Sequence, residues 1–173
     1  MKVIQNEDHY KFVIEEGINL AARSIWIATA NLKDMQIAMC KGRYRSIVEH
    51  LNDLAKNGIE IKLLYGGDPS IRFKKSYLMS DIHKGFSLLR CSRVHMKTII
   101  IDGSCMYLGS ANLTGAGVGV KKENLRNFEM GIITKDINEI DKAQSLFNMI
   151  WEGAFCKECG RRKICKKPID STR

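Results

Sequence analysis

Short apolar runs of strand length alternate with amphipathic stretches of helical length, and this alternation constrains the fold more than any other feature. Residues 24–30, Ser-Ile-Trp-Ile-Ala-Thr-Ala, are mostly apolar and partly β-branched, which is typical of a buried strand. Residues 43–57 place apolar side chains at helical spacing and end at Asn57-Gly58, a typical helix C-cap, before the next apolar segment over 59–65. Helices that alternate with strands in this way predict an α/β sandwich.

The remaining elements are predicted from the same two periodicities. The predicted helices are 9–22 with Asp8 as its N-cap, the basic segment 71–84, and a helix from Asp136 to about Trp151. The predicted strands are 86–89, 94–101, 105–108 and 127–134, with a turn over 102–104 and a loop over 113–127. We therefore expect one domain over 1–152, followed by a small appendage over 153–173 whose composition differs.

Charge indicates the class of partner. The 173 residues include 28 Lys and Arg against 19 Asp and Glu, a formal net charge of +9. A cationic surface favours nucleic acid or anionic lipid headgroups, and a basic surface that only keeps the protein soluble is the alternative. No apolar run approaches the roughly 18 residues of a membrane-spanning helix. The polar start of the chain lacks a signal-peptide pattern, so we expect a cytoplasmic protein with no transmembrane segment.

A histidine and a lysine lie two residues apart in the predicted strand 94–101. Successive side chains of a strand alternate between its faces, so His95 and Lys97 are expected to point the same way. The pair is unsuited to a core, because burying either group without a partner is costly. Together at the end of a sheet, the two side chains would form an anion site that contains a nucleophile. Taken alone, the pair is more typical of the solvated face of an edge strand. Asp102 lies at an odd offset from His95 and precedes a glycine, so we expect it to build a turn.

The pair belongs to a longer set of residues with defined spacing: His95-x-Lys97-x4-Asp102, then Gly109-Ser110-x-Asn112, then Asn127-Phe128-Glu129. This set resembles the HKD signature of the phospholipase D superfamily, and the alternation of helices and strands is compatible with it over most of residues 20–152. The resemblance implies a phospholipase D-like sandwich, a mixed β-sheet flanked by helices on both faces.

The resemblance also implies a role for each residue. His95 would attack phosphorus as a neutral imidazole and form a phosphohistidine, with no catalytic metal. Lys97 and Asn112 would bind the non-bridging phosphate oxygens, and Ser110 could orient the phosphate or its neighbours. Glu129 would accept a hydrogen bond from the far nitrogen of His95 and stabilise the imidazolium that forms later.

The chain carries one copy of the motif, although this mechanism needs a second histidine to protonate the leaving oxygen. None of the other histidines is followed by the complete motif, namely His9, His50 and His83. We therefore predict a homodimer with His95 from both chains in one site.

A small, basic chain with one motif is similar to the nuclease branch of the superfamily, so we predict cleavage of DNA or RNA. Basic residues that could follow a phosphate backbone are Arg72, Lys74, Lys75, Lys121, Lys122 and Arg126, although each alone is more typical of a solvated loop. No run of aromatic residues suggests base stacking, which predicts weak sequence preference. The alternatives are a phospholipase or phosphatidyl transferase acting on anionic lipid, and a non-catalytic nucleic-acid-binding module.

The basic tail carries three cysteines in a C-x2-C-x5-C pattern, Cys156, Cys159 and Cys165. C-x2-C lets two thiolates reach one ion from a tight turn, and neighbouring arginines would help to keep the sulfurs ionised. A tetrahedral site needs a fourth ligand, for which Cys91 is the first choice and Cys40 the second. We predict a structural zinc knuckle ahead of an iron–sulfur cluster, and three free thiols in a mobile tail are the alternative.

Overall fold

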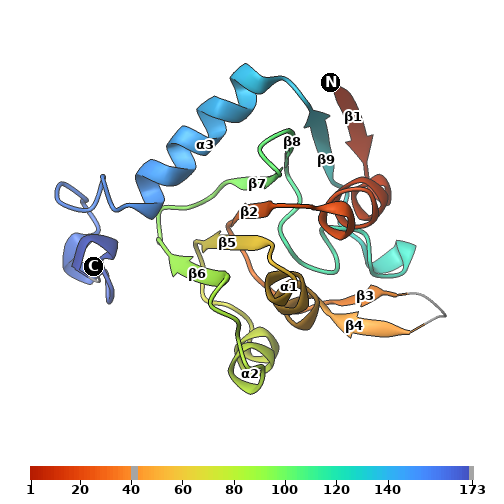
Figure 1. The fold of residues 1–173 in the computed structure, drawn as a ribbon, viewed down its shortest axis with the longest axis horizontal. Helices are drawn as coiled ribbons and strands as arrows, with labels where there is room; N and C mark the ends of the chain where they lie inside the picture. Colours follow the sequence, from red (N-terminus) through yellow and green to blue (C-terminus); the bar gives the residue numbers. More distant parts are fainter. Residues whose placement is uncertain (40–42, 172–173) are drawn as a thin grey trace.

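Seven strands form one mixed sheet at the centre of the molecule (Figure 1). The computed structural model describes residues 1–39 and 43–171. The strand order is β1-β9-β8-β7-β2-β5-β6; β2, β5 and β6 run parallel, and the other neighbouring pairs are antiparallel. The bounds are β1 (Lys2–Gln5), β2 (Ser24–Thr29), β5 (Glu60–Tyr65), β6 (Phe86–Arg90), β7 (Lys97–Ile101), β8 (Cys105–Gly109) and β9 (Met130–Thr134).

Three α-helices have polar N-caps that satisfy backbone N–H groups of the first turn. They are α1 (Ile47–Lys56), α2 (Ile71–Met79) and α3 (Ile137–Trp151). Their caps are Ser46, Ser70 and Asp136, which accept from Val48, Phe73 and Asn138 respectively. As predicted, α1 ends at Asn57, and Gly58 follows with a φ of +93°, which favours glycine.

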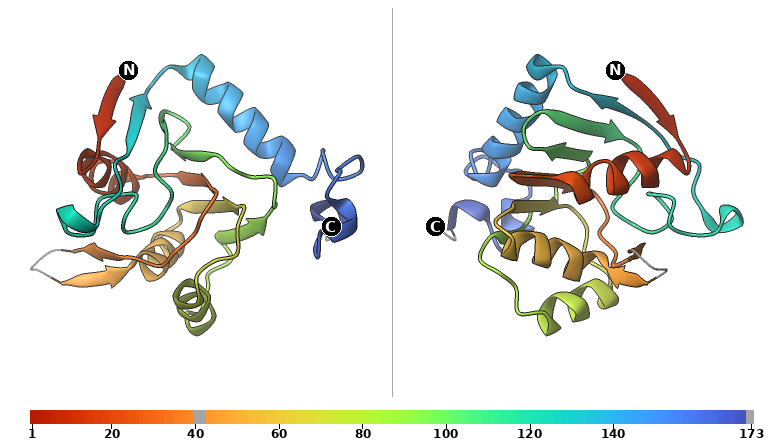
Figure 2. Two further views of the ribbon diagram at one scale, coloured as in Figure 1. Left: turned by 180° about the vertical axis from the view of Figure 1, so that it is seen from behind. Right: turned by 45° about the vertical axis from the view of Figure 1, so that its right-hand side comes forward.

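Alternate side chains of β2 point to opposite faces of the sheet. Ile25 and Ile27 belong to the larger core, which includes apolar residues of α1, α2 and the N-terminal turns. Trp26 and Ala28 pack on the other face, where the Trp26 ring stacks on Phe147 of α3 at 5.3 Å. Helices therefore cover both faces of the sheet, which confirms the predicted architecture (Figures 1 and 2).

The predicted helix over 9–22 is wrong in form. The segment folds as a π-helical turn, Tyr10–Glu15, and a 3-10 turn, Ile18–Leu20, with His9 rather than Asp8 at the N-cap position. Gly17 separates the two turns, and a Cβ there would lie 2.5 Å from the carbonyl oxygen of Val13. The segment is therefore two short turns that meet at this closely packed glycine, and not one regular helix.

Several predicted boundaries are also wrong, because pairing with another strand decides which residues join a strand. The start of the predicted helix 43–57 forms β4 (Tyr44–Ser46), which pairs with β3 (Gln36–Ala38). β7 begins at Lys97, so His95 precedes the strand that was predicted to contain it. β1, which the sequence did not indicate, pairs with β9.

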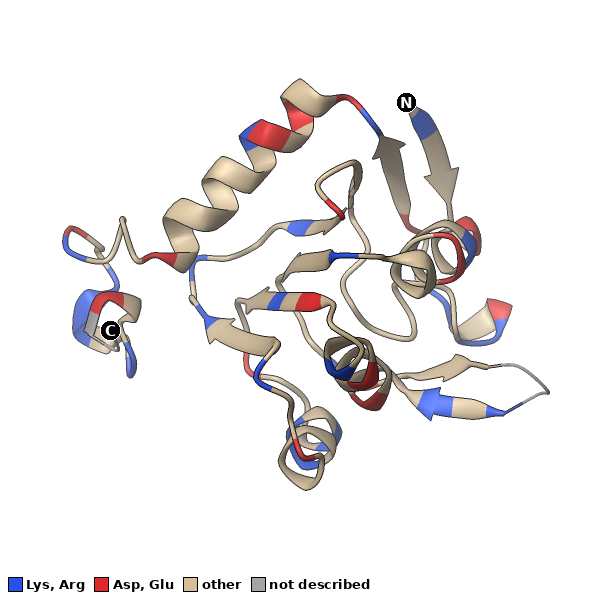
Figure 3. Cartoon of the chain, in the orientation of Figure 1, with Lys and Arg blue, Asp and Glu red and all other residues tan. Residues whose placement is uncertain are grey.

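The tail after α3 contains only short turns among its described residues. Gly153, with a φ of +77°, redirects the chain at the end of α3. Two 3-10 turns follow, Arg162–Ile164 and Ile169–Ser171, and basic residues gather along this segment (Figure 3). The division of the chain at residue 152 stays a prediction.

Within the described ranges, none of the helices combines the length and the apolar character needed to cross a bilayer.

Candidate active site

The pairing register aligns four residues across one edge of the sheet. Lys97 at the start of β7 pairs with Thr29 at the end of β2, Thr29 pairs with Tyr65 of β5, and Tyr65 pairs with Arg90 of β6. The carboxyl ends of the three parallel strands therefore meet the start of β7 at this edge. In open α/β sheets, ligands bind in the crevice outside the carboxyl ends of the strands.

His95 and Lys97 contact each other at this edge. Lys97 Nζ lies 3.2 Å from Nδ1 and 3.5 Å from Nε2 of His95, and it donates to the His95 carbonyl oxygen at 2.9 Å. An ammonium can only donate, so a ring nitrogen of His95 that bonds to it acts as the acceptor. The His95 side chain is exposed, so the ring that the motif assigns as nucleophile is accessible to substrate.

Asn112 is oriented by the end of β2. Its Oδ1 accepts from the backbone N–H of Asn31 at 2.9 Å and lies 3.3 Å from Thr29 Oγ1. The same hydroxyl accepts from the backbone N–H of Leu113 at 3.1 Å and donates to the Asn31 carbonyl at 2.8 Å. Because Oδ1 accepts from Asn31, the Nδ2 amide is the end that can donate to an anion. The role of Asn112 toward phosphate stays a prediction.

Ser110 and Glu129 form a second group beside this edge. Ser110 Oγ donates a short hydrogen bond to Glu129 Oε2, and Asn127 Nδ2 donates to Glu129 Oε1 at 3.0 Å. Ser110 Oγ also accepts from the backbone N–H of Met130 at 3.1 Å. The Glu129 carboxylate is thus bonded to Ser110 and Asn127, and the predicted hydrogen bond from His95 is not formed between these described residues. The role of Glu129 toward His95 stays a prediction.

Tyr107 fixes the glycine that precedes Ser110. A Cβ at Gly109 would lie 2.4 Å from the Tyr107 hydroxyl, and the facing Gly131 would meet the same ring at 2.4 Å. The hydroxyl accepts from the backbone N–H of Ala111 at 3.1 Å. Burial raises the pKa of Tyr107 to about 12, so the phenol stays neutral while it supports the loop that carries Ser110 and Asn112.

A second close approach positions His95. A Cβ at Gly66, just after β5, would lie 2.1 Å from the carbonyl oxygen of Val94. The backbone of Gly66 is in turn fixed, because its N–H donates to the Thr29 carbonyl at 3.1 Å. The segment that carries His95 therefore packs directly on the end of β5.

The four histidines of the chain all lie in described ranges, and only His95 contacts Lys97. His9 is fully buried beside Tyr107, with Nδ1 2.9 Å from the Asn6 carbonyl. His50, which lies on α1, is hydrogen-bonded to Asn19, and His83 Nδ1 accepts from Gly85 N.

Asp102 lies at the opposite end of β7 from Lys97. Its carboxylate accepts from the backbone N–H groups of Ala22, Arg23 and Ser24 at 2.7–2.9 Å. Partial burial acts to raise the pKa of Asp102, but these three hydrogen bonds outweigh it and lower the pKa. Asp102 adopts a φ of +55° in the turn, in agreement with the structural role that was predicted.

Two supporting residues were not found from the sequence. Thr29 and Asn31 position Asn112, and their signal is a polar side chain at or just after the end of an apolar strand. Asn127 belongs to the motif, and the structure adds that it donates to Glu129. Two of the candidate basic residues are paired with carboxylates: Arg72 Nε lies 3.6 Å from Asp34, and Arg126 Nη1 lies 3.5 Å from Glu7.

The structure brings four of the predicted metal ligands to the lining of one small cavity, namely Cys91, Cys156, Cys159 and Cys165. In the present side-chain conformations, no three Cys, His, Asp or Glu residues of the described ranges form a group that could hold a metal ion. Metal binding therefore stays a prediction. Cys40, the second choice for the fourth ligand, lies outside the described residues.

The sequence profile of the family described as "Cardiolipin synthase, PLD-like domain" matches residues 14–151. The chain belongs to the phospholipase D-like family. The match covers every residue of the HKD motif and ends before the cysteine-containing tail. No curated protein matches the chain.

Solved structures of this phospholipase D-like fold resemble the chain at low sequence identity. NucT from Helicobacter pylori superposes with a TM-score of 0.64 at 19% identity, covering 87% of this chain and 94% of the other. Nuc from Salmonella typhimurium, a phospholipase D family member, gives 0.60 at 17% identity, with 87% and 93% covered. TrmBL2, an archaeal chromatin protein, gives 0.58 at 16% identity, with 87% of this chain and 51% of that chain covered.

Proposed function

We propose that this phospholipase D-like protein is a metal-independent phosphodiesterase that cleaves DNA or RNA through a phosphohistidine intermediate. The observation that carries the proposal is the exposed His95 ring beside the Lys97 ammonium, at the edge where Asn112 is oriented with its amide NH2 available. A cation and an amide donor next to a nucleophile suit a phosphate with two anionic oxygens. These groups are hydrogen-bond donors, so they supply the stabilisation that a metal ion provides in other phosphodiesterases.

Each chemical step has a group to perform it. A nitrogen of His95 forms the N–P bond while the P–O bond to the leaving group breaks, and Lys97 and Asn112 stabilise the charge on the non-bridging oxygens. The leaving oxygen takes a proton from a second acid. Water, deprotonated by the resulting base, then attacks phosphorus and releases His95.

The second acid comes from another copy of the chain in this proposal. His9, His50 and His83 are engaged within the fold, as described above, so none of them is available at the exposed site. His95 of the partner subunit, placed across a shared cleft by a two-fold axis, supplies the missing imidazole.

A large groove favours a nucleic-acid substrate. The groove has a volume of about 800 Å³ and lies between α2 and the tail. His95, Lys97 and Asn112 are not among its lining residues, but Tyr65 and Arg90 of the aligned row that starts at Lys97 are. Its remaining basic residues are Lys74, Arg161, Lys166 and Lys167. A long basic groove with a tyrosine at its edge suits a polyanionic strand.

The DNA binding named for TrmBL2 supports the same class of partner, whereas the family description names cardiolipin synthase and so makes lipid the alternative. The free cysteines among the described residues are in keeping with the reducing cytoplasm that we propose as the compartment.

The decisive test is cleavage of a labelled single-stranded oligonucleotide in excess EDTA, compared with turnover of phosphatidylglycerol vesicles. We expect oligonucleotide cleavage in EDTA that falls about a thousandfold or more in His95→Ala, because the variant lacks the nucleophile. Lys142→Ala, which removes an exposed cation from α3, serves as the control and should keep full activity. Lipid turnover alone, or oligonucleotide binding without turnover of either substrate, would contradict the proposal.

The shared site is tested by mixing subunits. If each site needs His95 from two chains, a dimer of one wild-type and one His95→Ala subunit has no complete site. An equal mixture that has exchanged subunits should then keep about a quarter of the activity of an all-wild-type sample at the same total concentration. Half of the activity would show that each chain acts alone, and the Lys142→Ala variant mixed with wild type should show no loss.

A further inference from the structure

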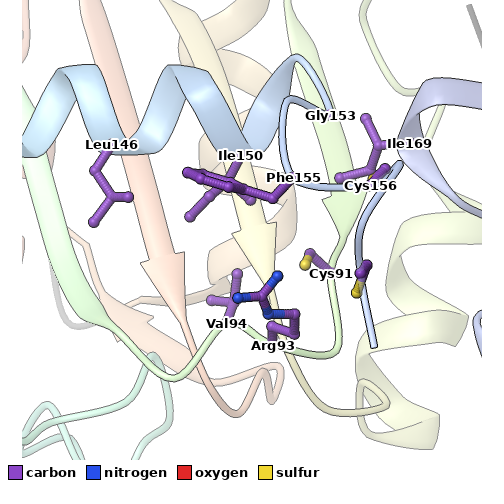
Figure 4. A pocket seen from close by; sticks show the side chains of 10 residues that line it. Cys91, Arg93, Val94, Leu146, Ile150, Gly153, Phe155, Cys156 and Ile169 are labelled. Carbon is purple, nitrogen blue, oxygen red and sulfur yellow. The ribbon is translucent and has the colours of Figure 1, made fainter. Parts of the chain in front are cut away.

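Four cysteines from two distant parts of the chain line one cavity of about 20 Å³. Three belong to the tail, Cys156, Cys159 and Cys165, and the fourth, Cys91, directly follows β6. Figure 4 shows the larger neighbouring pocket, about 190 Å³, in which Cys91 and Cys156 also lie together at the end of α3. Cys91 and Cys156 are 65 positions apart in the sequence. Their place in the same cavity is therefore a property of the tertiary structure.

Backbone geometry holds both sets of cysteines at this point. Cys159 N donates to the Cys156 carbonyl at 3.2 Å, which gives the tight turn that C-x2-C ligands use. Cys91 N donates to the Tyr65 carbonyl at 2.9 Å, which fixes Cys91 to the sheet. Arg161 Nη1 donates to the Ser92 carbonyl at 2.5 Å and joins the tail to the segment that carries Cys91.

Cationic side chains surround the cavity. Four thiolates around a divalent cation carry a net charge of minus two. The cavity is lined by cations that offset this charge, namely Arg90, Arg93, Arg161, Arg162 and Lys167.

We propose that Cys91, Cys156, Cys159 and Cys165 bind one structural zinc ion that clamps the tail to the segment between β6 and β7. Four thiolates give the closed tetrahedral set that structural zinc sites use. No three of these sulfurs are grouped for metal binding in the present side-chain conformations, so the proposal requires them to turn toward a common centre about their Cα–Cβ bonds, where a cysteine has three staggered positions.

The tail has a physical need for such a clamp. Among its described residues it has no strand or long helix, and Ile169 is its one buried apolar side chain apart from residues at the end of α3. A small segment without a core of its own is commonly stabilised by a metal or by disulfides. The clamp would also fix Arg161, Lys166 and Lys167, which line the groove described above, although this consequence rests on the proposed function.

The test is the zinc content of the full chain, purified without added metal and measured by mass spectrometry of the metal together with protein concentration. We expect about one zinc per chain in wild type. Substituting cobalt should give the intense visible bands of tetrahedral thiolate coordination. Cys91→Ser should lose the metal, and Cys105→Ser, which changes a cysteine of β8 outside the cavity, should keep it.

Two further samples separate the outcomes. Cys91→His should restore zinc content, because imidazole replaces thiolate as a ligand, and this rescue excludes misfolding as the cause of loss in Cys91→Ser. His95→Ala should keep its zinc, so the metal site is judged independently of nuclease activity. Wild type without zinc, zinc retained in Cys91→Ser, or iron with the absorption of a cluster would overturn the proposal.

Discussion

Single side chains at the edge of the sheet bind the phosphate in the proposed mechanism, and some of them act through another residue. Lys97 is proposed to contact the phosphate, whereas the Thr29 hydroxyl donates to the Asn31 carbonyl at 2.8 Å and acts on Asn112 through Asn31, whose N–H binds Asn112 Oδ1. The buried hydroxyl of Thr29 is also the partner of Leu113 N, so its removal leaves a buried N–H without its acceptor. Thr29 is therefore a positioning residue.

Thr29→Val should lower kcat about tenfold, which corresponds to the loss of one hydrogen bond of about 1–1.5 kcal/mol, the bond by which Thr29 fixes Asn31 and through it Asn112. KM for the oligonucleotide should change little, because the basic groove is untouched. Steady-state cleavage measures both parameters. Thr98→Val, a matched change at another buried threonine of the sheet, should leave kcat unaltered. Equal losses in the two valine variants would assign the effect to general disturbance of the sheet.

At the scale of elements, the ends of strands carry out different tasks. The start of β7 presents Lys97 to the candidate active site, and its other end is followed by Asp102, which binds three backbone N–H groups where β2 begins. One element thus has a functional end and a structural end. The HKD motif combines the two, because its histidine and lysine lie at one end of a five-residue strand and its aspartate lies at the other.

Asp102→Asn should lower the free energy of unfolding by about 1–3 kcal/mol. The carboxylate accepts hydrogen bonds through both oxygens, whereas the asparagine NH2 is a donor and would leave at least one backbone N–H without its acceptor. The contribution of the wild-type carboxylate is present above about pH 4, its unfolded pKa, and is lost as pH falls through the lowered folded pKa. Urea unfolding at pH 7 measures the difference. Asp141→Asn on α3 is the control, and an equal loss there would refute the assignment.

Over the whole molecule, two buried histidines link folding to pH. Burial lowers the pKa of His9 and of His50, although a hydrogen bond that His9 Nδ1 donates to the Asn6 carbonyl partly offsets the effect at His9. In the unfolded chain both rings become protonated as the pH falls through about 6.5, the ordinary pKa of histidine, whereas in the folded chain they become protonated only at lower pH. Below that pH the unfolded state binds more protons, so stability falls as the solution becomes more acidic.

The free energy of unfolding should therefore decrease below about pH 6.5, by up to about 1.4 kcal/mol per pH unit for each linked proton. His9→Phe keeps an aromatic ring against Tyr107 and removes one titrating group, so its stability should depend less steeply on pH between 5 and 7. Urea titrations at several pH values give the slopes. The Lys142→Ala variant should reproduce the wild-type slope, and an unchanged slope in His9→Phe would contradict the linkage.

The sequence was sufficient for features that depend on local patterns. Period-two and helical spacing predicted β2, α1, β5 and α3, because each buries an apolar face whose spacing is set by backbone geometry. The motif likewise predicted the family that the profile match now shows. Residues such as Thr29 and Asn31 were missed because their task is defined by a partner more than 80 positions away.

What the sequence alone determined is thus the class of fold, its alternating elements, and the family to which the chain belongs. The tertiary structure decided where strands begin, as at Lys97, and where an irregular turn replaces a helix, as at Gly17. It also placed Cys91 in a cavity with three cysteines of the tail. The physical reason is that local propensity is a property of neighbouring residues, whereas register, close backbone contacts and convergent side chains depend on which distant segments pack together.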